Sequence, residues 1–203
     1  MIVVVEGISA AGKTTWCRNH AERLLVRESY PSPRPDRNAD AMKAAQAWTD
    51  WNARRWADAL ATEEERGVAV CDTDPLKLHF IWGLWRIGEA PKEHWLYQLE
   101  ETREAFRRKV LGFADIYLVK RIDPATARRQ RDGDTERDRS NFDLHARLQA
   151  SLHAWYEAIA GCVPAKVEWA LPCGLPAGRC IGTKAHRYDV DLFDRFVASL
   201  PKG

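Results

Sequence analysis

A closely spaced set of small, basic and hydroxyl residues lies near the start of the chain. Residues 7–14 are Gly-Ile-Ser-Ala-Ala-Gly-Lys-Thr and match the pattern GxxxxGK[ST] at every fixed position. Glycines let a backbone turn so tightly that successive N–H groups point at one anion, and a helix that begins at the lysine adds its positive end. The lysine suits the β- and γ-phosphates of a nucleotide, and the hydroxyl suits its Mg²⁺.

The residues of this loop have different expected roles. Lys13 neutralises the transferred phosphate and is expected to be catalytic, whereas the Thr14 hydroxyl is a metal ligand. The other nucleotide-binding positions act mainly through the backbone, and they are Gly7, Ser9, Ala10, Ala11, Gly12 and Thr15. The alternative is a glycine-rich turn without a ligand. Its context argues against this, because an apolar β-branched run at 2–5 precedes the loop and a helical pattern over 14–23 follows it.

Two acids follow another apolar run, at 68–71, in the sequence Asp72-Thr73-Asp74. In an open α/β sheet, ligands bind beyond the carboxyl ends of the strands. Acids at that place hold Mg²⁺ or orient an acceptor hydroxyl, so we expect Asp72 to be catalytic and a metal ligand beside Thr14. In the alternative interpretation the acids only cap the next helix, with Asp74 before Pro75.

Arginines are concentrated between residues 121 and 140, where they are interleaved with acids. Arg128 and Arg131 lie one turn apart on a predicted helix, a spacing at which two guanidinium groups can hold the oxygens of one phosphoryl group. We expect a lid at about 124–141 that closes over the nucleotide and excludes water. The alternative is a solvated helix face crossed by salt bridges.

The elements that must position these residues alternate along the chain. Strands are expected at 2–5, 24–28, 68–71, 116–119 and 167–171. Helices are expected at 14–23, 40–66, 76–88 with a break at Gly83, 93–111, 124–131, 142–160 and 190–200. Strands separated by helices indicate βαβ crossovers, so the prediction is an α/β P-loop NTPase fold, with about five parallel strands between two helical layers and an arginine-rich lid.

Composition excludes several classes of protein. The 203 residues are 45% hydrophobic and 30% charged with a net charge of +2, which is typical of a globular chain and gives no bulk attraction to nucleic acid. The opening apolar run is too short for a signal peptide or a membrane span. Five scattered cysteines without metal-binding spacing indicate reduced thiols, so we expect a cytoplasmic protein that binds no membrane.

The motifs favour a kinase over other nucleotide-binding proteins. No NKxD motif follows the strand at 116–119, which argues against a Ras-like GTPase and favours ATP. The chain resembles the thymidylate kinase and deoxynucleoside kinase branch of the nucleoside and nucleotide kinases. The resemblance lies in residues 2–7 and 13–15, and in the stretch 114–139 with its Asp-Pro and Ala-Arg-Arg steps. Thr73 stands where that family has an arginine, and the Asp-Thr-Asp form is similar to nicotinamide riboside kinase domains.

The resemblance implies further roles. It makes residues 1–203 one kinase domain, with acceptor-binding regions at about 28–66 and 76–108 and with arginines of the lid on the phosphates. It also implies an acid after the second strand as the base, for which Glu28 and Asp36 are both candidates. The segment 172–183 would wrap the adenine of ATP, with Arg179 stacked on the ring. A homodimer is one of the assemblies left open.

Aromatic and basic side chains offer candidates for the acceptor pocket. Core packing is the expected role of most tryptophans, with at most two in contact with the acceptor, out of Trp48, Trp51, Trp56, Trp82, Trp85 and Trp95. Arg86 and Arg103 are candidates for an acceptor phosphate. The expected function is phosphoryl transfer from ATP to a nucleoside or nucleoside monophosphate. The alternatives are a kinase of an antibiotic or a vitamin precursor, and a nucleotide-binding regulator.

Overall fold

The computed structural model describes residues 1–133, 141–176 and 184–202, and a parallel sheet lies at its centre. Its strands are β1 (Ile2–Glu6), β2 (Leu25–Val26), β3 (Ala69–Asp72), β4 (Ile116–Val119) and β5 (Lys166–Glu168). They pair in parallel in the order β2-β3-β1-β4-β5, with Val4 opposite Cys71 on one side and Tyr117 on the other. The prediction of about five parallel strands is confirmed.

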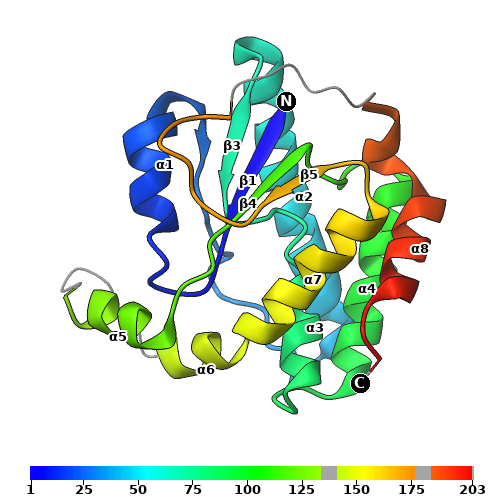
Figure 1. Ribbon diagram of the computed structural model, residues 1–203. Helices are drawn as coiled ribbons and strands as arrows, with labels where there is room; N and C mark the ends of the chain where they lie inside the picture. The colour runs from blue at the N-terminus through cyan, green and yellow to red at the C-terminus, as the bar shows by residue number, and fades with distance from the viewer. Residues whose placement is uncertain (134–140, 177–183, 203) are drawn as a thin grey trace.

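Helices cover both faces of this sheet (Figure 1). They are α1 (Lys13–Ala21), α2 (Ala41–Arg66), α3 (Leu78–Arg86), α4 (Lys92–Arg107), α5 (Pro124–Asp132), α6 (Phe142–Arg147), α7 (Gln149–Cys162) and α8 (Val190–Ser199), with short 3₁₀ turns at Glu22–Leu24 and Lys184–Tyr188. Alternation along β1 divides the core, because successive side chains of a strand point to opposite faces. Val3 and Val5 pack with Trp16 of α1, whereas Ile2 and Val4 belong to the larger cluster on the other face.

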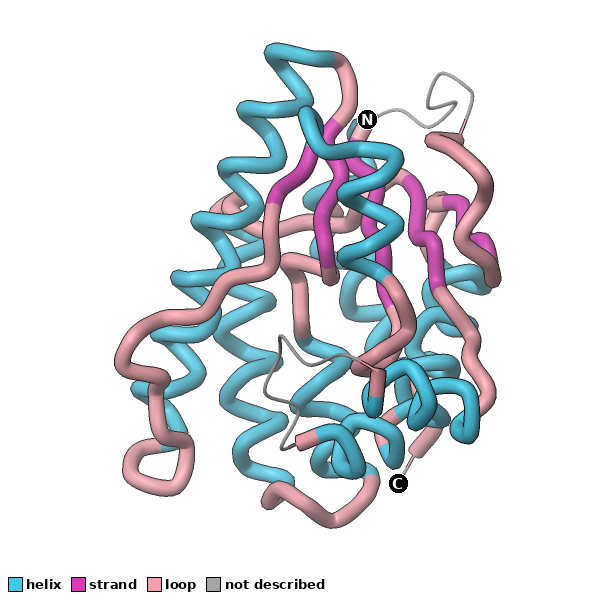
Figure 2. Tube along the Cα trace, turned by 90° about the vertical axis from the view of Figure 1, so that its left-hand side faces the viewer, coloured by secondary structure: helices cyan, strands magenta, loops and turns pink. Residues whose placement is uncertain are grey.

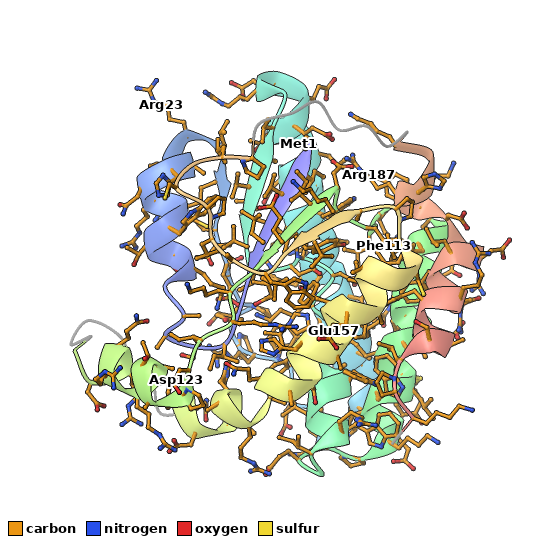
Figure 3. The ribbon with its side chains drawn as sticks, in the orientation of Figure 1. Met1, Arg23, Phe113, Asp123, Glu157 and Arg187 are labelled. Carbon is orange, nitrogen blue, oxygen red and sulfur yellow. The ribbon has the colours of Figure 1, made fainter. Side chains whose placement is uncertain are left out.

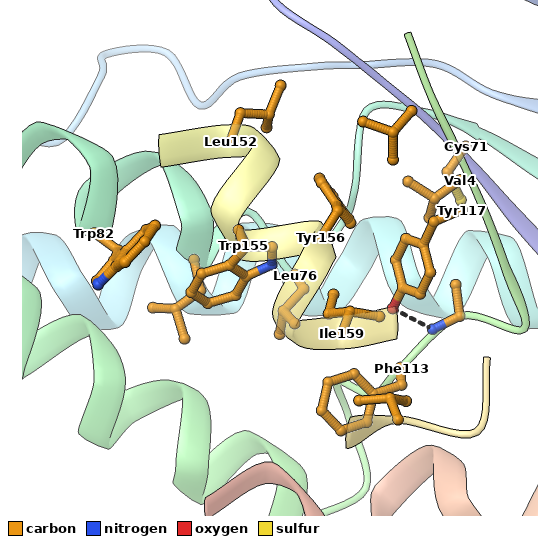
Figure 4. Packing of buried hydrophobic residues seen from close by; sticks show 14 of the residues in the cluster. Val4, Cys71, Leu76, Trp82, Phe113, Tyr117, Leu152, Trp155, Tyr156 and Ile159 are labelled. Carbon is orange, nitrogen blue, oxygen red and sulfur yellow. Dashed lines mark hydrogen bonds between the residues drawn. The ribbon is translucent and has the colours of Figure 1, made fainter. Parts of the chain in front are cut away.

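The larger cluster is built on aromatic side chains (Figure 4). Trp155 of α7 is fully buried, with its ring 5.8 Å from that of Trp82 and 4.8 Å from that of Phe196. Tyr117 of β4 is equally buried, and its hydroxyl accepts a hydrogen bond of 2.9 Å from the backbone N–H of Ala114. The expectation that most tryptophans pack in the core therefore agrees with the positions of Trp56, Trp82 and Trp95, which are all buried.

The two ends of the sheet differ in their surroundings. At the amino ends, the buried Arg187 joins Glu63 at 2.8 Å and Asp115 at 2.8 Å, close to Met1 (Figure 3). At the carboxyl ends, β1, β3 and β4 point into the half of the molecule that contains α3, α5 and α6, and the turned view in Figure 2 shows the same division. The loops that leave the strands at that second end therefore meet in one place.

Several predicted boundaries were wrong. Gly83 does not break its helix, because α3 runs through it, and its missing side chain lets α7 approach. A Cβ atom there would lie 3.0 Å from a methyl carbon of Leu148 and 3.3 Å from Cβ of Ser151. The predicted helix over 142–160 is two helices separated at Leu148, and β5 ends at Glu168 rather than at residue 171. The helix predicted to reach residue 111 ends at Arg107, two residues before Lys109, whose φ of 58° does not fit a helix.

The described helices contain no segment long and apolar enough to cross a membrane.

Candidate active site

The loop between β1 and α1 has the backbone that its sequence predicts. Gly12 has a φ of 83° and leads directly into α1, which begins at Lys13. Ala10 also has a positive φ, of 66°, which is a strained conformation for a residue with a side chain. At Gly7 a Cβ atom would lie 3.0 Å from the carbonyl oxygen of Lys120, so the loop leaves no room for a side chain. The start of α1 thus presents N–H groups at the carboxyl end of the sheet.

Three polar side chains of the expected set meet here. The Lys13 ammonium donates hydrogen bonds to the carbonyl oxygens of Gly7 at 2.6 Å and Ile8 at 3.1 Å. The Thr14 hydroxyl donates to Oδ2 of Asp72 at 2.6 Å. Oδ1 of Asp72 is buried and has no hydrogen-bond partner among the described residues, and burial raises the pKa of this carboxyl. The structure therefore brings Lys13, Thr14 and Asp72 to one place, and one carboxylate oxygen of Asp72 is available there to bind a ligand.

A buried carboxylate that sequence reasoning missed joins the loop to β3. Glu6 is 3% exposed, and its two oxygens accept from the N–H groups of Gly7 at 2.9 Å and Asp74 at 3.1 Å. Its position directly before the first glycine of the loop is the only sequence signal. Because one side chain holds both backbones, the phosphate loop and the acids after β3 keep a fixed spacing.

Arg55 of α2 supports the turn after β3, and no sequence motif marks it. Its Nη2 donates to the carbonyl oxygens of Asp72 at 2.9 Å and Thr73 at 3.1 Å, and its side chain is buried. Thr73 has a φ of 67°, which is an outlier for a β-branched residue. The strained turn directs Asp72 toward Thr14 and places Thr73 in the wall of a cavity.

Asp74, the other acid of this turn, lies inside the protein and not at the surface of the site. Oδ1 accepts from the N–H of Leu76 at 2.9 Å, and the Tyr156 hydroxyl donates to Oδ2 at 3.1 Å. Burial, followed by the nearby charge of Glu6, raises the pKa of Asp74 from 3.8 to about 7, although these hydrogen bonds oppose the rise. The first of the two bonds closes a turn before α3, whose N-cap is Lys77, so the interpretation of Asp74 as the cap of that helix is wrong.

The raised pKa of Asp74 predicts how stability depends on pH. Between about pH 4 and pH 7 the folded protein binds a proton here that the unfolded chain releases, so the free energy of unfolding should fall as the pH rises through this window. The substitution Asp74→Asn keeps an oxygen for Leu76 and removes the charge. In urea unfolding, the free energy of unfolding of the wild type should be lower at pH 8 than at pH 5. This decrease should be smaller in the variant, by on the order of 2 kcal/mol. The control Asp58→Asn, at an exposed position, should show the same decrease in the free energy of unfolding as the wild type. A decrease in Asp74→Asn equal to that of the wild type would show that another group is responsible.

Next to the phosphate loop is a cavity of about 820 Å³, which Lys13 and Thr14 line from the loop side. Glu28, which follows β2, forms an ion pair with Lys77, and both side chains line the same cavity. Burial alone would raise the pKa of Glu28, but the charges of Lys77 and Lys13 outweigh it and hold the pKa well below its usual range. Glu28 is thus an ionised hydrogen-bond acceptor throughout the physiological pH range.

The wall of the cavity away from the loop is aromatic and rich in hydrogen-bond donors. The Tyr30 and Trp48 rings lie 6.5 Å apart, and the Arg37 guanidinium lies 5.2 Å from the centre of the Trp48 ring. Gln98 of α4 is fixed by bonds from its amide nitrogen to the Ala45 carbonyl oxygen at 3.1 Å and the Thr49 hydroxyl at 2.6 Å. This wall is suited to a flat ring with polar atoms at its edge.

The other predicted residues lie elsewhere. Asp36 is exposed on a turn, where Oδ1 accepts from the N–H of Asn38 at 2.8 Å, and it does not line the cavity. Arg86 donates to the carbonyl oxygen of Pro201 at 3.1 Å, and Arg103 pairs with Asp194 at 2.7 Å, so neither reaches the cavity.

The arginines predicted for the lid lie on α5. Arg128 is exposed, whereas Arg131 lies 4.8 Å from the centre of the Phe142 ring, which itself lines the cavity. The rest of the predicted lid, at 134–140, is outside the described residues, as is Arg179. The lid and the adenine loop therefore stay predictions.

Strand order, the loop between β1 and α1 and the two helical layers together define a P-loop NTPase fold of the nucleoside kinase type. Among solved structures, the chain is similar to deoxyadenosine kinase from M. mycoides with bound dATP, at 14% identity over 98% of this chain and 99% of that chain, with a TM-score of 0.57. The same enzyme with bound dCTP matches at 14% identity over 98% and 100% of the two chains, also with a TM-score of 0.57. No family model and no curated protein matches the sequence.

Proposed function

We propose that this protein transfers the γ-phosphoryl group of ATP to a small-molecule acceptor, of the nucleoside or nucleoside monophosphate type. The observation that carries the proposal is one cavity lined both by the phosphate loop and by an aromatic wall with fixed polar groups. A nucleotide-binding regulator has no need of a binding space for a second molecule, such as the part of the cavity between Lys13 and the aromatic wall. The resemblance to nucleoside kinases in sequence and fold agrees with this division into a phosphate end and a ring end.

The phosphate end supplies positive charge. Backbone N–H groups of the loop and the start of α1 bind the phosphates, and Lys13 turns from its own loop carbonyls to the β- and γ-oxygens. Arg128 and Arg131 complete the charge neutralisation when α5, as the proposed lid, closes. In the reaction a bond forms between the acceptor oxygen and the γ-phosphorus, and the bond from that phosphorus to the oxygen of the leaving ADP breaks. The proton of a hydroxyl acceptor passes to water.

Thr14 and Asp72 fit a role as ligands of Mg²⁺. A hydroxyl and a carboxylate are hard oxygen donors, and the unpaired buried Oδ1 of Asp72 has no other use in the described structure. The described residues contain no cluster of three or more acidic, histidine or cysteine side chains around a metal, which suits an ion that shares its coordination with phosphates and water. When bound, Mg²⁺ supplies charge stabilisation at the phosphates.

Glu28 orients the acceptor in this proposal. With its pKa held below the usual range, it is a weak proton acceptor at neutral pH but a strong hydrogen-bond acceptor. Phosphoryl transfer through a loose transition state needs little deprotonation of the hydroxyl before the bond forms, so orientation is the larger contribution. Lys77 holds the Glu28 carboxylate in place through their ion pair. It also adds a cation near Thr73, which stands where the resembled family has an arginine.

The test is acceptor-dependent release of ADP from ATP and Mg²⁺ over a panel of nucleosides, nucleoside monophosphates and nicotinamide riboside. One or more acceptors should raise ADP release well above the rate with ATP alone. Binding of ATP without any acceptor-dependent release over the panel, extended to aminoglycosides and vitamin precursors, would favour the regulator instead.

A further inference from the structure

Arg37 is a cation of the cavity wall that has no acidic partner in the described part of the chain. Among the residues that the structure describes, none forms an ion pair with it, and its nearest polar contact is a long one of 3.4 Å from Nη2 to Oε1 of the neutral Gln98. Its Nε is buried without a hydrogen-bond partner there. Burial lowers its pKa to about 10, and no neighbouring charge opposes this fall. A bound anion would form charge-assisted hydrogen bonds with this half-buried guanidinium and so offset the free-energy cost of its burial.

The neighbours of Arg37 are also donors. Nε1 of Trp48 is buried without a hydrogen-bond partner among the described residues, and Arg34 lies 4.6 Å from the centre of the Tyr30 ring on the same wall. Gln98 offers a carbonyl oxygen, but that oxygen faces Arg37 because its amide nitrogen is held by Ala45 and Thr49. This end of the cavity therefore has several donors and little to accept a proton.

Two aromatic rings connect Arg37 with the ion pair of Glu28 and Lys77 at the phosphate end. The Arg37 guanidinium lies 5.2 Å from the centre of the Trp48 ring, which lies 6.5 Å from the Tyr30 ring, and the Lys77 ammonium lies 5.4 Å from the centre of the Tyr30 ring. A ligand that spans the cavity would thus meet positive charge at both ends. One end is already assigned to phosphate.

We infer that the acceptor carries a carboxylate on its ring, at the end remote from the oxygen that is phosphorylated, and that Arg37 binds it. This inference rests on the proposed function. A planar carboxylate matches the edge of a guanidinium and lies in the plane of a ring held by Trp48 and Tyr30. The corresponding amide has one oxygen and one NH₂ group in these positions, so at least one of the donors of Arg37 and Trp48 would face the NH₂ group and stay unpaired.

The experiment compares two matched pairs of acceptors that differ at this group: nicotinic acid riboside with nicotinamide riboside, and 5-carboxyuridine with uridine. The wild type should prefer the carboxylate of at least one pair by about tenfold or more in kcat/KM. Arg37→Gln should abolish that preference, mainly through KM of the carboxylate acceptor, and Arg37→Lys should keep part of it. The matched control is Arg54→Gln, an exposed change on α2 that should leave the preference intact.

The same pairs are measured by equilibrium binding, through quenching of tryptophan fluorescence in the presence of a non-hydrolysable ATP analogue. If no acceptor gives ADP release, the proposed function fails, and the binding preference still decides the inference about the carboxylate. Equal binding of both members of each pair, or a carboxylate preference that survives in Arg37→Gln, would overturn it. Guanosine is the rival, because its O6 and N7 also match a guanidinium edge, and a preference for guanosine over both carboxylates would overturn the inference too.

Discussion

Replacing Lys13 with alanine is expected to lower kcat/KM for phosphoryl transfer by about 10²–10³-fold, the loss seen when one preorganised donor is removed from a transition state. Lys13 is the only lysine of the loop, and its ammonium already lies against the Gly7 and Ile8 carbonyl oxygens. Its charge follows the transferred phosphoryl group, so kcat should fall more than the affinity for ATP. ADP release measured at saturating acceptor checks the loss.

The matched control for this prediction is Lys43→Ala. Lys43 is 81% exposed on α2 and forms a surface ion pair with Asp40, so its loss should change kcat/KM by less than about twofold. Both variants should unfold at wild-type urea concentrations, because Lys13 makes hydrogen bonds to the loop and no ion pair in the described structure. A Lys13→Ala protein that keeps a tenth or more of its activity would contradict the proposed role.

The phosphate end of the site could be predicted from sequence because its geometry is local. Gly7, Gly12, Lys13 and Thr14 are close in the chain, and the strand before them and the helix after them are short periodic patterns. The pairing of Asp72 with Thr14 needed one more step, since parallel strands present their carboxyl ends at the same edge of a sheet. No knowledge of the packing of the helices was required for either.

The acceptor end depends on packing that has no pattern in the sequence. Gln98 and Thr49 meet because α2 packs against α4, about fifty residues further along the chain, and Arg37, in the segment before α2, contacts the same Gln98 side chain. Lys77 reaches Glu28 only because the chain after β3 takes a left-handed turn at Lys77, with a φ of 46°. Asp36 was an equal candidate on sequence grounds because nothing local distinguishes it from Glu28.

Boundaries failed where a tertiary contact outweighed a local preference. A glycine inside an apolar helical run usually weakens the helix, yet Gly83 is kept helical by the close approach of Leu148 and Ser151 from the other side. The short edge strand β5 ends early because only three residues pair with β4, between Lys166 and Glu168. Such contacts belong to the assembled fold, so a window of sequence does not contain them.

Asp72→Asn is expected to lower kcat/KM by about 10²–10³-fold at limiting Mg²⁺, with partial recovery as Mg²⁺ is raised. The change keeps the size of the side chain and an oxygen for the Thr14 hydroxyl, and it removes the negative charge that a divalent ion needs. The reduced activity should therefore appear as a weaker apparent affinity for Mg²⁺ in a titration at fixed ATP. The exposed Asp50→Asn on α2 is the control and should keep the wild-type Mg²⁺ titration.

The pH dependence of the same variant separates a metal ligand from a residue that only supports the fold. Burial raises the pKa of Asp72, so a proton competes with Mg²⁺ for this carboxylate at low pH, and the wild type should require more Mg²⁺ at pH 5 than at pH 8. Asparagine has no proton to lose, so the Mg²⁺ requirement of Asp72→Asn should change less between these pH values than that of the wild type, and the remaining change is that of the ATP phosphates. A buried acid with a raised pKa is less favourable to stability when ionised, so the variant should be at least as stable as the wild type at pH 8. An inactive Asp72→Asn protein that is less stable at pH 8 and has an unchanged Mg²⁺ requirement would assign Asp72 to the fold instead.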